Sequence, residues 1–466
     1  MVRIFNHYVS RAGIILLLLE VLALLAAAVL VSLVWLPERR PGQMYLAAVV
    51  FVAPVVACMA ALGMYGQQRC EDAKALLARL LPALVLAYLL HRWLILLAPA
   101  AALRSGMNGA AGDAAWLAFL LGAGGVLLTR MLLFGSRQSR LITARVILVG
   151  DGMLALECLQ LAAAPQGLHQ FHVIGCVPVP GENSCVPAGS VLPSGQPLLA
   201  LARAYEADEV IVSVADRRNG AYPVRELLEC ALGGVHVTDA AQFFEREASQ
   251  IRVDSLQPSY LIFGGGFDQG PLRAAVKRCF DLLASAAICI AALPLMALAA
   301  AAIVVEDGGP VIFRQERVGR HGQPFQLLKF RSMRIDAESD GRPRWAELGD
   351  ARITRVGRWI RLLRIDELPQ MLNVFRGEMS FVGPRPERAF FVDQLVRQVP
   401  YYDVRHSIKP GITGLAQVRY QYGASLDDAV RKLQYDLYYV KNNSLFLDLL
   451  ILIDTVQVVL FGKGSR

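Results

Sequence analysis

The first third of the chain is dominated by long apolar stretches with few polar interruptions. Four of them each have about the 20 residues that a helix needs to cross a lipid bilayer. They run from Gly13 to Trp35, Tyr45 to Tyr65, Ala75 to Ala98 and Ala115 to Phe134. A cleaved signal peptide would have a shorter apolar region followed by a small-residue cleavage site. The pattern therefore predicts a four-helix transmembrane bundle over residues 1–136.

After the bundle, short apolar runs alternate with glycine and polar segments. The run "ARVILVGDGMLALECLQLA" is typical of a buried strand, a glycine turn and a helix, with Gly150, Gly152 and Ala155 spaced as in a dinucleotide-binding βαβ unit. Two more strands, "FHVIGCVPV" and "DEVIVSVA", and a helix around Val224 to Leu232 complete a predicted Rossmann-like α/β domain over residues 137–262. The second strand ends in proline and glycine where a ribose-binding acid is expected, which favours a structural or regulatory domain over an NAD site.

A linker over residues 263–276 leads to another apolar segment, Leu282 to Val305, which is long enough to cross a membrane. Pro294 falls at its middle, where proline removes a helix hydrogen bond. Basic residues flank both ends: Lys277 and Arg278 before it, and Arg314, Arg317 and Arg320 after it. Because basic flanks stay in the cytoplasm, we expect a helix–break–helix over residues 279–305 that enters one leaflet and returns. The alternative is a kinked fifth span, which would put the remaining chain outside.

Residues 277–466 are predicted to form a separate α+β monotopic domain, rich in arginine and broken by glycine and proline. Strands are expected in "PVIFRQERVG" and "PFQLLKFRSM", and helices near Ile353 to Leu363 and Leu368 to Phe375. The C-terminal segment "SLFLDLLILIDTVQVVLF" is apolar but contains Asp448 and Asp454. These acids favour a helix in the membrane interface, or one packed on the re-entrant segment, over another span.

Composition and charge agree with a membrane protein whose polar part lies in the cytoplasm. Hydrophobic residues make up 55% of the 466 residues, and the mean hydropathy of +0.43 is high for a soluble protein. Basic residues cluster at both ends of the bundle: Arg3, Arg11, Arg137, Arg140 and Arg145. This places both ends in the cytoplasm, and the eight cysteines, with no CxxC pair, suit a reducing compartment. The net charge of +8 suits anionic headgroups or phosphates.

The stretch "RLLRIDELPQ" places two acids, Asp366 and Glu367, side by side behind a run of arginines. The arginines recur at every third position: Arg352, Arg355, Arg358, Arg361 and Arg364. One interpretation is that Asp366 caps the following helix and that the arginines form a solvated face. The other is chemical: carboxylates among cations are ionised and suited to hold Mg²⁺. Adjacent carboxylates, a divalent cation and guanidinium groups are what phosphoryl transfer requires, and a carboxylate can itself be the nucleophile.

A second motif, Gly383-Pro384-Arg385-Pro386-Glu387, is a rigid turn that suits phosphate or nucleotide binding. From Lys277 to its end, the chain resembles the monotopic phosphoglycosyl transferases, bacterial sugar transferases that begin exopolysaccharide and O-antigen assembly. The matching pieces are "KRCFD", "PVIFRQERVGRHGQPFQLLKFRSM", "LRIDELPQMLNVFRGEMSFVGPRPE", "KPGITGLAQV" and "YDLYYVKNNSLFLDL". The four spans and the Rossmann-like domain resemble the large members, the polyprenyl-phosphate hexose-1-phosphate transferases. The opening "IFNHYV" is similar to the exosortase-associated exopolysaccharide subgroup.

The resemblance implies a two-step transfer of hexose-1-phosphate from a UDP-sugar to polyprenyl (undecaprenyl) phosphate. Asp366 would attack the β-phosphate, releasing UMP and forming an aspartyl-phosphosugar; it would also hold Mg²⁺, with Glu367 completing the catalytic pair. Substrate-binding roles are implied for Arg361, Arg385, Lys329, Arg331 and Glu387. Members commonly have Ser-Pro at the helix break, and Leu293-Pro294 departs from that pattern, which puts the support of the bend in question.

The implied location is the bacterial inner membrane, as a multi-pass protein with its catalytic domain facing the cytoplasm. Its expected partners are the UDP-sugar, polyprenyl phosphate and membrane lipids, with no nucleic acid, and the domain organisation is compatible with a homodimer. The alternative from another functional class is a membrane-anchored nucleotide sensor or scaffold that binds its nucleotide at Gly150 to Ala155. An NAD-dependent epimerase is disfavoured because the sequence has no Tyr-x-x-x-Lys pair. Glucose, galactose and an N-acetylated sugar remain open as the hexose, with glucose favoured by the subgroup.

Overall fold

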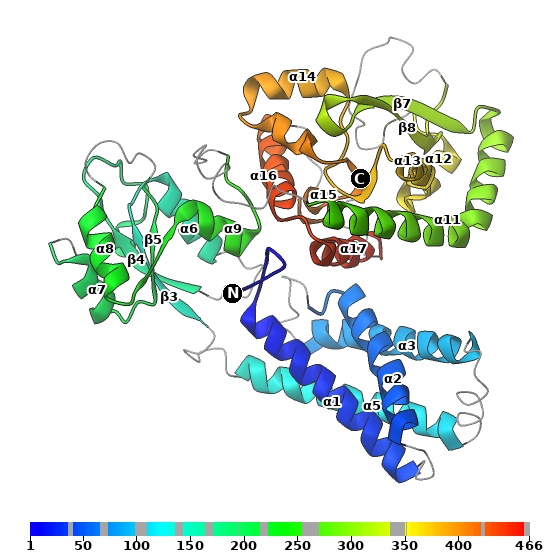
Figure 1. Ribbon diagram of the computed structural model, residues 1–466, viewed down its shortest axis with the longest axis horizontal. Coiled ribbons are helices and arrows are strands. Elements are labelled where there is room, and N and C mark those ends of the chain that lie inside the picture. Colours follow the sequence, from blue (N-terminus) through cyan, green and yellow to red (C-terminus); the bar gives the residue numbers. More distant parts are fainter. Residues whose placement is uncertain are drawn as a thin grey trace. The chain divides into compact units, whose positions relative to one another are not determined.

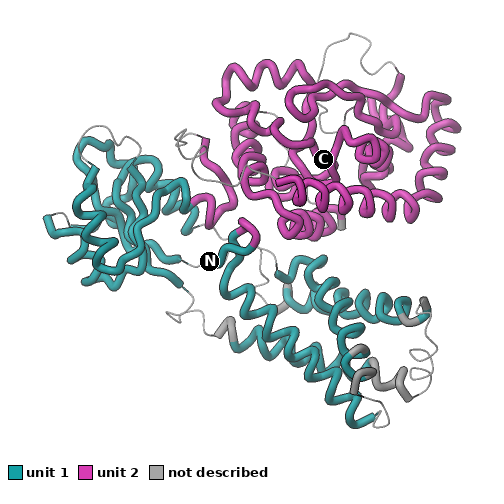
Figure 2. Tube along the Cα trace, viewed as in Figure 1, with its two compact units in different colours: residues 1–4, 8–243 teal, residues 5–7, 244–466 magenta. Residues whose placement is uncertain are grey.

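The computed structural model describes most of the chain and divides it into two compact units (Figure 2). The described residues are 1–35, 41–65, 73–97, 110–135, 143–163, 171–193, 195–214, 222–253, 270–335, 350, 352–420 and 425–460. The first unit comprises residues 1–4 and 8–243, and the second comprises residues 5–7 and 244–466.

The four apolar stretches of the first unit form four helices (Figure 1). They are α1 (Arg11–Trp35), α2 (Pro41–Ala61), α3 (Ala73–Leu97) and α5 (Ala110–Gly135). Their buried faces share one apolar cluster, in which the rings of Phe51 and Phe119 meet edge to face with centroids 4.7 Å apart. Among the described residues, three helices are long and apolar enough to cross a membrane: α1, residues Leu76–Leu94 of α3, and Pro271–Asp307 in the second unit. Ala47–Ala61 and Trp116–Leu132 are shorter apolar helices. The helices are present as expected, and their passage through a membrane stays a prediction.

An ion pair lies inside these apolar helices. Arg130 Nε donates to Glu20 Oε1 at 2.6 Å, and both side chains are fully buried. Arg130 Nη2 also donates to the carbonyl of Met64 at 3.3 Å. Because breaking a buried ion pair leaves an uncompensated charge in an apolar environment, the pair fixes α1 against α5.

The rest of the first unit is built on a four-stranded parallel sheet. Its strands are β3 (Ala144–Val149), β4 (Phe171–Val177), β5 (Glu209–Val212) and β6 (His236–Asp239), in the spatial order β4-β3-β5-β6. The accompanying helices are α6 (Met153–Ala163), α7 (Leu198–Ala204), α8 (Val224–Leu232) and α9 (Ala240–Ala248), the last of which crosses into the second unit. Val146 to Val149 are almost fully buried, as expected for a central parallel strand covered on both faces. The predicted strands and the helix at Val224 are confirmed.

The second unit combines two small sheets with several helices. Strands β7 (Ile312–Val318) and β8 (Pro324–Phe330) form an antiparallel pair, and β9 (Ser380–Val382) and β10 (Gly411–Thr413) pair in parallel. The helices are α11 (Pro271–Asp307), α12 (Arg355–Leu362), α13 (Gln370–Arg376), α14 (Ala389–Gln398), α15 (Leu415–Arg419), α16 (Leu426–Asn442) and α17 (Leu445–Leu460). Short 3-10 turns include η3 (Ile365–Glu367) and η4 (Tyr402–Ser407). Both predicted strands and both predicted helices of this region are present.

The long helix α11 bends part-way along its length (Figure 1), and both of its limbs contact the same unit. Near its start, Arg278 Nη1 donates to the carbonyl of Val374 at 2.6 Å. Near its end, the carboxylate of Glu306 accepts from the N–H groups of Arg355 and Val356 at 2.7 and 2.9 Å. The helix is continuous through Pro294, so the break expected there is a bend within one helix. Proline removes only a single backbone donor, and the helix continues on both sides of it.

The C-terminal helix α17 contacts α11, which agrees with the second of the two alternatives that its sequence left open. Lys277 Nζ lies 2.7 Å from Asp448 of α17 and 3.0 Å from Asp281. Tyr439 of α16 also donates to Asp448, at 2.6 Å. Asp448 is therefore paired inside the second unit.

The N-terminal strands β1 (Val2–Ile4) and β2 (His7–Val9) are joined by a turn whose residues Phe5–His7 belong to the second unit. There, His7 Nδ1 lies 2.7 Å from the hydroxyl of Tyr438.

Candidate active site

The segment that carries the two acids turns sharply between two helices. α12 begins after Thr354, whose hydroxyl accepts from the N–H of Gly357 at 2.8 Å. Arg364 follows α12 in a left-handed conformation with φ 59°, which is uncommon for a residue other than glycine and often marks functional sites. The N-cap of α13 is Pro369, so Asp366 does not cap that helix. The capping interpretation of the acid pair is therefore wrong.

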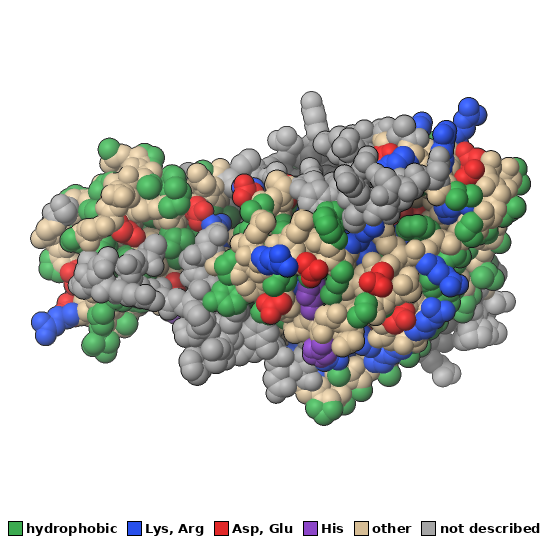
Figure 3. Space-filling view, turned by 90° about the horizontal axis from the view of Figure 1, so that it is seen from above, with side chains coloured by type: hydrophobic (Ala, Val, Ile, Leu, Met, Phe, Trp, Pro, Cys, Tyr) green, Lys and Arg blue, Asp and Glu red, His purple; other side chains and the backbone are tan. Residues whose placement is uncertain are grey.

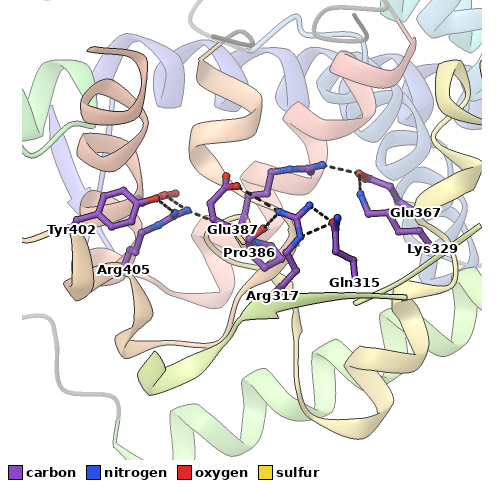
Figure 4. Close-up of polar contacts among 10 residues, drawn as sticks. Gln315, Arg317, Lys329, Glu367, Pro386, Glu387, Tyr402 and Arg405 are labelled. Atoms are coloured by element: carbon purple, nitrogen blue, oxygen red, sulfur yellow. Dashed lines mark hydrogen bonds and ion pairs between the residues drawn. The ribbon is translucent and has the colours of Figure 1, made fainter. Parts of the chain in front are cut away.

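Glu367 is surrounded by cations. Its Oε1 lies 3.1 Å from Arg385 Nη2, 3.3 Å from Lys329 Nζ and 3.8 Å from Arg364 Nη1, and Figure 4 shows the Lys329 contact. Burial disfavours the charge on Glu367, but Lys329, Arg385 and Arg364 outweigh it and hold its pKa well below the ordinary value. Burial lowers the pKa of Lys329, and the charge of Glu367 opposes that shift. Glu367 is thus ionised and lies within a cluster of three cations.

Asp366, the adjacent acid, has a different environment. Its side chain is 9% exposed, and its Oδ1 has no hydrogen-bond partner among the described residues. Burial raises the pKa of Asp366 to about 6, and the charge of Glu367 adds to the increase, although Lys329 and Arg361 act in the opposite direction. Two neighbouring acids with pKa values shifted in opposite directions are a common arrangement for groups with separate catalytic roles.

The surroundings of Asp366 fit a divalent cation that binds together with a phosphorylated substrate. Mg²⁺ is usually held by one or two carboxylates, with substrate phosphates and water completing its oxygen ligands. Asp366 Oδ1, which has no hydrogen-bond partner among the described residues, would be such a ligand, whereas Glu367 is engaged by cations. In the described parts of the chain, no three His, Cys, Asp or Glu side chains group together so as to hold a metal. The substrate would therefore supply the other oxygen atoms.

The predicted rigid turn, residues 383–387, brings Arg385 to Glu367. Its backbone lies against a neighbouring segment so closely that a Cβ on Gly383 would be 2.6 Å from the carbonyl of Lys409. Glu387 has a different partner, since its carboxylate lies 3.5 Å from Arg317 Nη1 on β7 (Figure 4). Of the two candidate residues in this turn, Arg385 contacts the acid pair and Glu387 is directed to β7.

The other candidate residues are distributed between the acid pair and α11. Arg361 has its Nη1 buried without a hydrogen-bond partner among the described residues, and its charge lowers the pKa of Asp366. Arg331 instead donates to the carbonyls of Asp307 and Gly308 at 3.1 and 2.6 Å. It therefore caps the end of α11, the helix that contains Pro294. Strand β8 ends at Phe330, so the alternation that would align Arg331 with Lys329 no longer applies.

Three residues beside the site were not predicted to be site residues, although Arg364 was noted as part of the arginine run. Arg364 pairs with Glu367 across one turn, a spacing that "RIDE" displays. Arg405 and Asp436 form a buried ion pair 2.8 Å long. They lie on separate elements, η4 and α16, so no local pattern relates them.

Charge on the visible surface does not form a single basic field. On the face shown in Figure 3, lysine and arginine side chains are interspersed with acidic and apolar ones.

The glycine turn of the α/β domain is filled by a carboxylate of the same domain. Glu182 Oε2 accepts from the N–H of Asp151 at 3.2 Å. A Cβ on Gly150 or on Gly152 would lie 2.9 or 3.2 Å from the Glu182 carboxylate. Helix α6 begins just after this turn, and a helix N-terminus favours negative charge. A dinucleotide phosphate bound here would have to displace Glu182.

Comparisons with known proteins agree with the geometry of the second unit. Residues 272–462 match the family described as bacterial sugar transferase. A UDP-N-acetylgalactosamine-undecaprenyl-phosphate N-acetylgalactosaminephosphotransferase of Aeromonas hydrophila is 37% identical over 373 residues, covering 76% of this chain and 87% of the relative. A UDP-glucose:undecaprenyl-phosphate glucose-1-phosphate transferase of Caulobacter vibrioides is 44% identical over 197 residues, covering 41% of this chain and 73% of the relative. An undecaprenyl-phosphate glucose phosphotransferase of Komagataeibacter xylinus is 42% identical over 194 residues, which cover 41% of this chain and 36% of the relative.

A buried carboxylate among arginines, in a unit that contains a long apolar helix, suits a membrane-associated transferase of phosphorylated groups. The chain belongs to the bacterial sugar transferase family and is a phosphoglycosyl transferase.

Proposed function

We propose that the protein transfers a hexose-1-phosphate from a UDP-sugar to undecaprenyl phosphate through a covalent intermediate on Asp366. In the first step, a carboxylate oxygen of Asp366 bonds to the β-phosphorus, the bond from that phosphorus to the bridging oxygen breaks, and UMP leaves with that oxygen. In the second step, a phosphate oxygen of undecaprenyl phosphate attacks the same phosphorus and the carboxylate is released. The product is a polyprenyl-diphospho-sugar, which begins exopolysaccharide assembly in the membrane.

The contrast between Asp366 and Glu367 carries this proposal. Glu367 has its charge neutralised by three cations, whereas Asp366 keeps an unbonded oxygen in a buried site. A desolvated carboxylate with a raised pKa is a better nucleophile than a solvated one, and the nearby Arg361 stabilises negative charge as it develops on the phosphate. Asp366 would hold Mg²⁺, which neutralises phosphate charge when bound.

Release of UMP in a defined mixture tests this function. We expect the purified full-length enzyme to release UMP from one UDP-sugar when undecaprenyl phosphate and Mg²⁺ are present. The panel should contain UDP-glucose, UDP-galactose and their N-acetylated forms, because the relatives' names include glucose and N-acetylgalactosamine. UMP measured by a coupled assay should fall to background with EDTA. No release with any donor would contradict the proposal.

In the proposed membrane arrangement, α11 enters the cytoplasmic leaflet of the inner membrane and returns. Both of its limbs contact one unit, and most of its apolar side chains, such as Leu293 and Leu298, are exposed. A single unit that holds both ends of a bent helix supports the return of the chain to the same side. The soluble UDP-sugar and the lipid-borne phosphate would then meet at one carboxylate on that side.

The structure supports a division of the arginine run between two tasks. Two of its members, Arg355 and Arg358, are exposed on α12. Trp359, Leu362 and the C-cap residue Leu363 are also exposed, by 66%, 51% and 56%. At about 100° per residue, the four exposed residues of α12 fall on one face of the helix, and Leu363 continues that face beyond its end. A face with aromatic, aliphatic and basic side chains suits a lipid headgroup layer. The other three arginines are half-buried, and two of them, Arg361 and Arg364, influence the acid pair.

Cysteine labelling tests the arrangement of α11. Single cysteines at Cys279 and at Gly309→Cys, placed before and after the apolar part, should both react with an impermeant maleimide only in inverted membrane vesicles. The matched control is a pair at the two ends of α1, Ser10→Cys and Val34→Cys, which should react from opposite sides. Reaction of positions 279 and 309 from opposite sides would establish a fifth span instead.

A further inference from the structure

The backbone around Arg385 is held at four consecutive carbonyl groups. The carbonyl of Pro384 accepts from the N–H of Gly411 at 2.9 Å, and that of Glu387 accepts from the N–H of Val318 at 2.9 Å. The two carbonyls between them, those of Arg385 and Pro386, accept from arginine side chains. Pro384 and Pro386 themselves have no N–H and a fixed φ. The turn is therefore restrained on both sides of Arg385.

Two guanidinium groups bind the carbonyls at the centre of this turn. Arg317 Nη1 donates to the carbonyl of Pro386 at 3.1 Å, and Arg405 Nη2 donates to the carbonyl of Arg385 at 2.9 Å. Figure 4 shows both arginines reaching toward the turn. Hydrogen bonds from a charged donor are about twice as strong as those between neutral groups.

Arg405 is itself fixed by buried partners. Its Nη2 also lies 2.8 Å from Asp436, with both side chains at most 6% exposed, and its Nη1 contacts the hydroxyl of Tyr402 at 2.7 Å. Buried ion pairs of this kind often contribute little to stability compared with apolar packing. Their planar, two-sided geometry instead defines the position of whatever they bind.

We infer that Arg405 and Asp436 are positioning residues that act on the sugar nucleotide through Arg385. Asp436 orients the guanidinium of Arg405, and Arg405 holds the carbonyl of Arg385. The side chain of Arg385 is then directed to the cation cluster around Glu367, with Arg385 Nη2 at 3.1 Å from Glu367. This inference rests on the proposed function and on the substrate-binding role that the family resemblance implies for Arg385, which we assign to the nucleotide.

A double-mutant cycle tests whether Arg405 acts through Arg385. In the full-length enzyme, Arg405→Lys should raise the KM for the UDP-sugar and the Kd for UDP about tenfold or more, because one ammonium cannot contact both Asp436 and the carbonyl. In an Arg385→Gln background, the same change should have less than about a twofold effect, since coupled residues are not additive. Asp436→Asn should raise the KM for the UDP-sugar in the same way as Arg405→Lys. Neither change should alter the KM for undecaprenyl phosphate.

A second buried ion pair on α16 provides the matched control. Lys441 lies 2.9 Å from Glu245, and both side chains are 3% exposed. Lys441→Met should lower the melting temperature but leave the KM for the UDP-sugar unchanged in both backgrounds. Additive effects of Arg405→Lys and Arg385→Gln, or an Arg405→Lys effect confined to the melting temperature, would overturn the inference. UDP binding that shows the coupling while UMP release is absent would support the inference and refute the proposed function.

Discussion

Replacing Asp366 with asparagine is expected to reduce UMP release by about 10³-fold or more, because an amide cannot form the acyl phosphate bond. The two side chains have nearly the same shape, so the fold should survive the change. Removing a buried charge also removes its desolvation cost, and we expect the melting temperature to equal or exceed that of the wild type. UMP release and thermal unfolding of the full-length enzyme check these two results.

Intact-protein mass spectrometry provides a second measurement of the same step. Incubated with the UDP-sugar and Mg²⁺ but no lipid acceptor, the wild type should gain the mass of one phosphosugar, and the Asp366→Asn variant should gain none. Asp393→Asn, which changes an exposed acid on α14, is the control and should form the adduct. A nucleotide sensor or scaffold would give no adduct in any of the three proteins. An adduct on a peptide without residue 366 would assign the nucleophile elsewhere.

The sequence predicted the acid pair but not the different environments of its two members. Composition and spacing placed carboxylates among arginines, and Lys329, Arg361 and Arg385 do approach the pair or affect its pKa values. Which acid is neutralised depends on the left-handed turn at Arg364 and on a contact made by Arg385 from a distant turn. Neither follows from local spacing, because φ at Arg364 departs from the usual preference of its residue type.

The secondary structure followed the apolar pattern closely, and the differences have identifiable causes. The strands from Ala144 and Pro324 and the helix at Val224 occur where the periodicity indicated. The break expected at Pro294 is a bend, because the helix loses only one donor there. Residues Ile251 and Val253 pack in the core of the second unit, although the α/β domain predicted from the sequence, residues 137–262, includes them. Long-range packing of this kind has no periodic signal.

A Glu367→Gln variant is expected to slow the first step by about 10²-fold, since Lys329 and Arg385 would lose the charge that holds them in place. The same change should shift the acid limb of the pH profile to lower pH. In the wild type, the first step requires ionised Asp366, so its rate should rise with pH around the pKa of about 6 and then level off. Because the Glu367 charge raises the pKa of Asp366, removing that charge lowers it. The carboxylate is then ionised at lower pH but is a weaker nucleophile.

Lys329→Met is the control variant, for which the acid limb of the pH profile should shift in the opposite direction. The charge of Lys329 lowers the pKa of Asp366, so its removal should shift the acid limb to higher pH, whereas Glu367→Gln shifts it to lower pH. Single-turnover UMP release without the lipid acceptor, measured from pH 4.5 to pH 8, isolates the first step and reports the ionisation that precedes it. If both variants kept the acid limb of the wild type, a group other than Asp366 would control the reaction. Opposite shifts would identify the carboxyl of Asp366 as the titrating group, because each neighbour contributes the sign of its own charge.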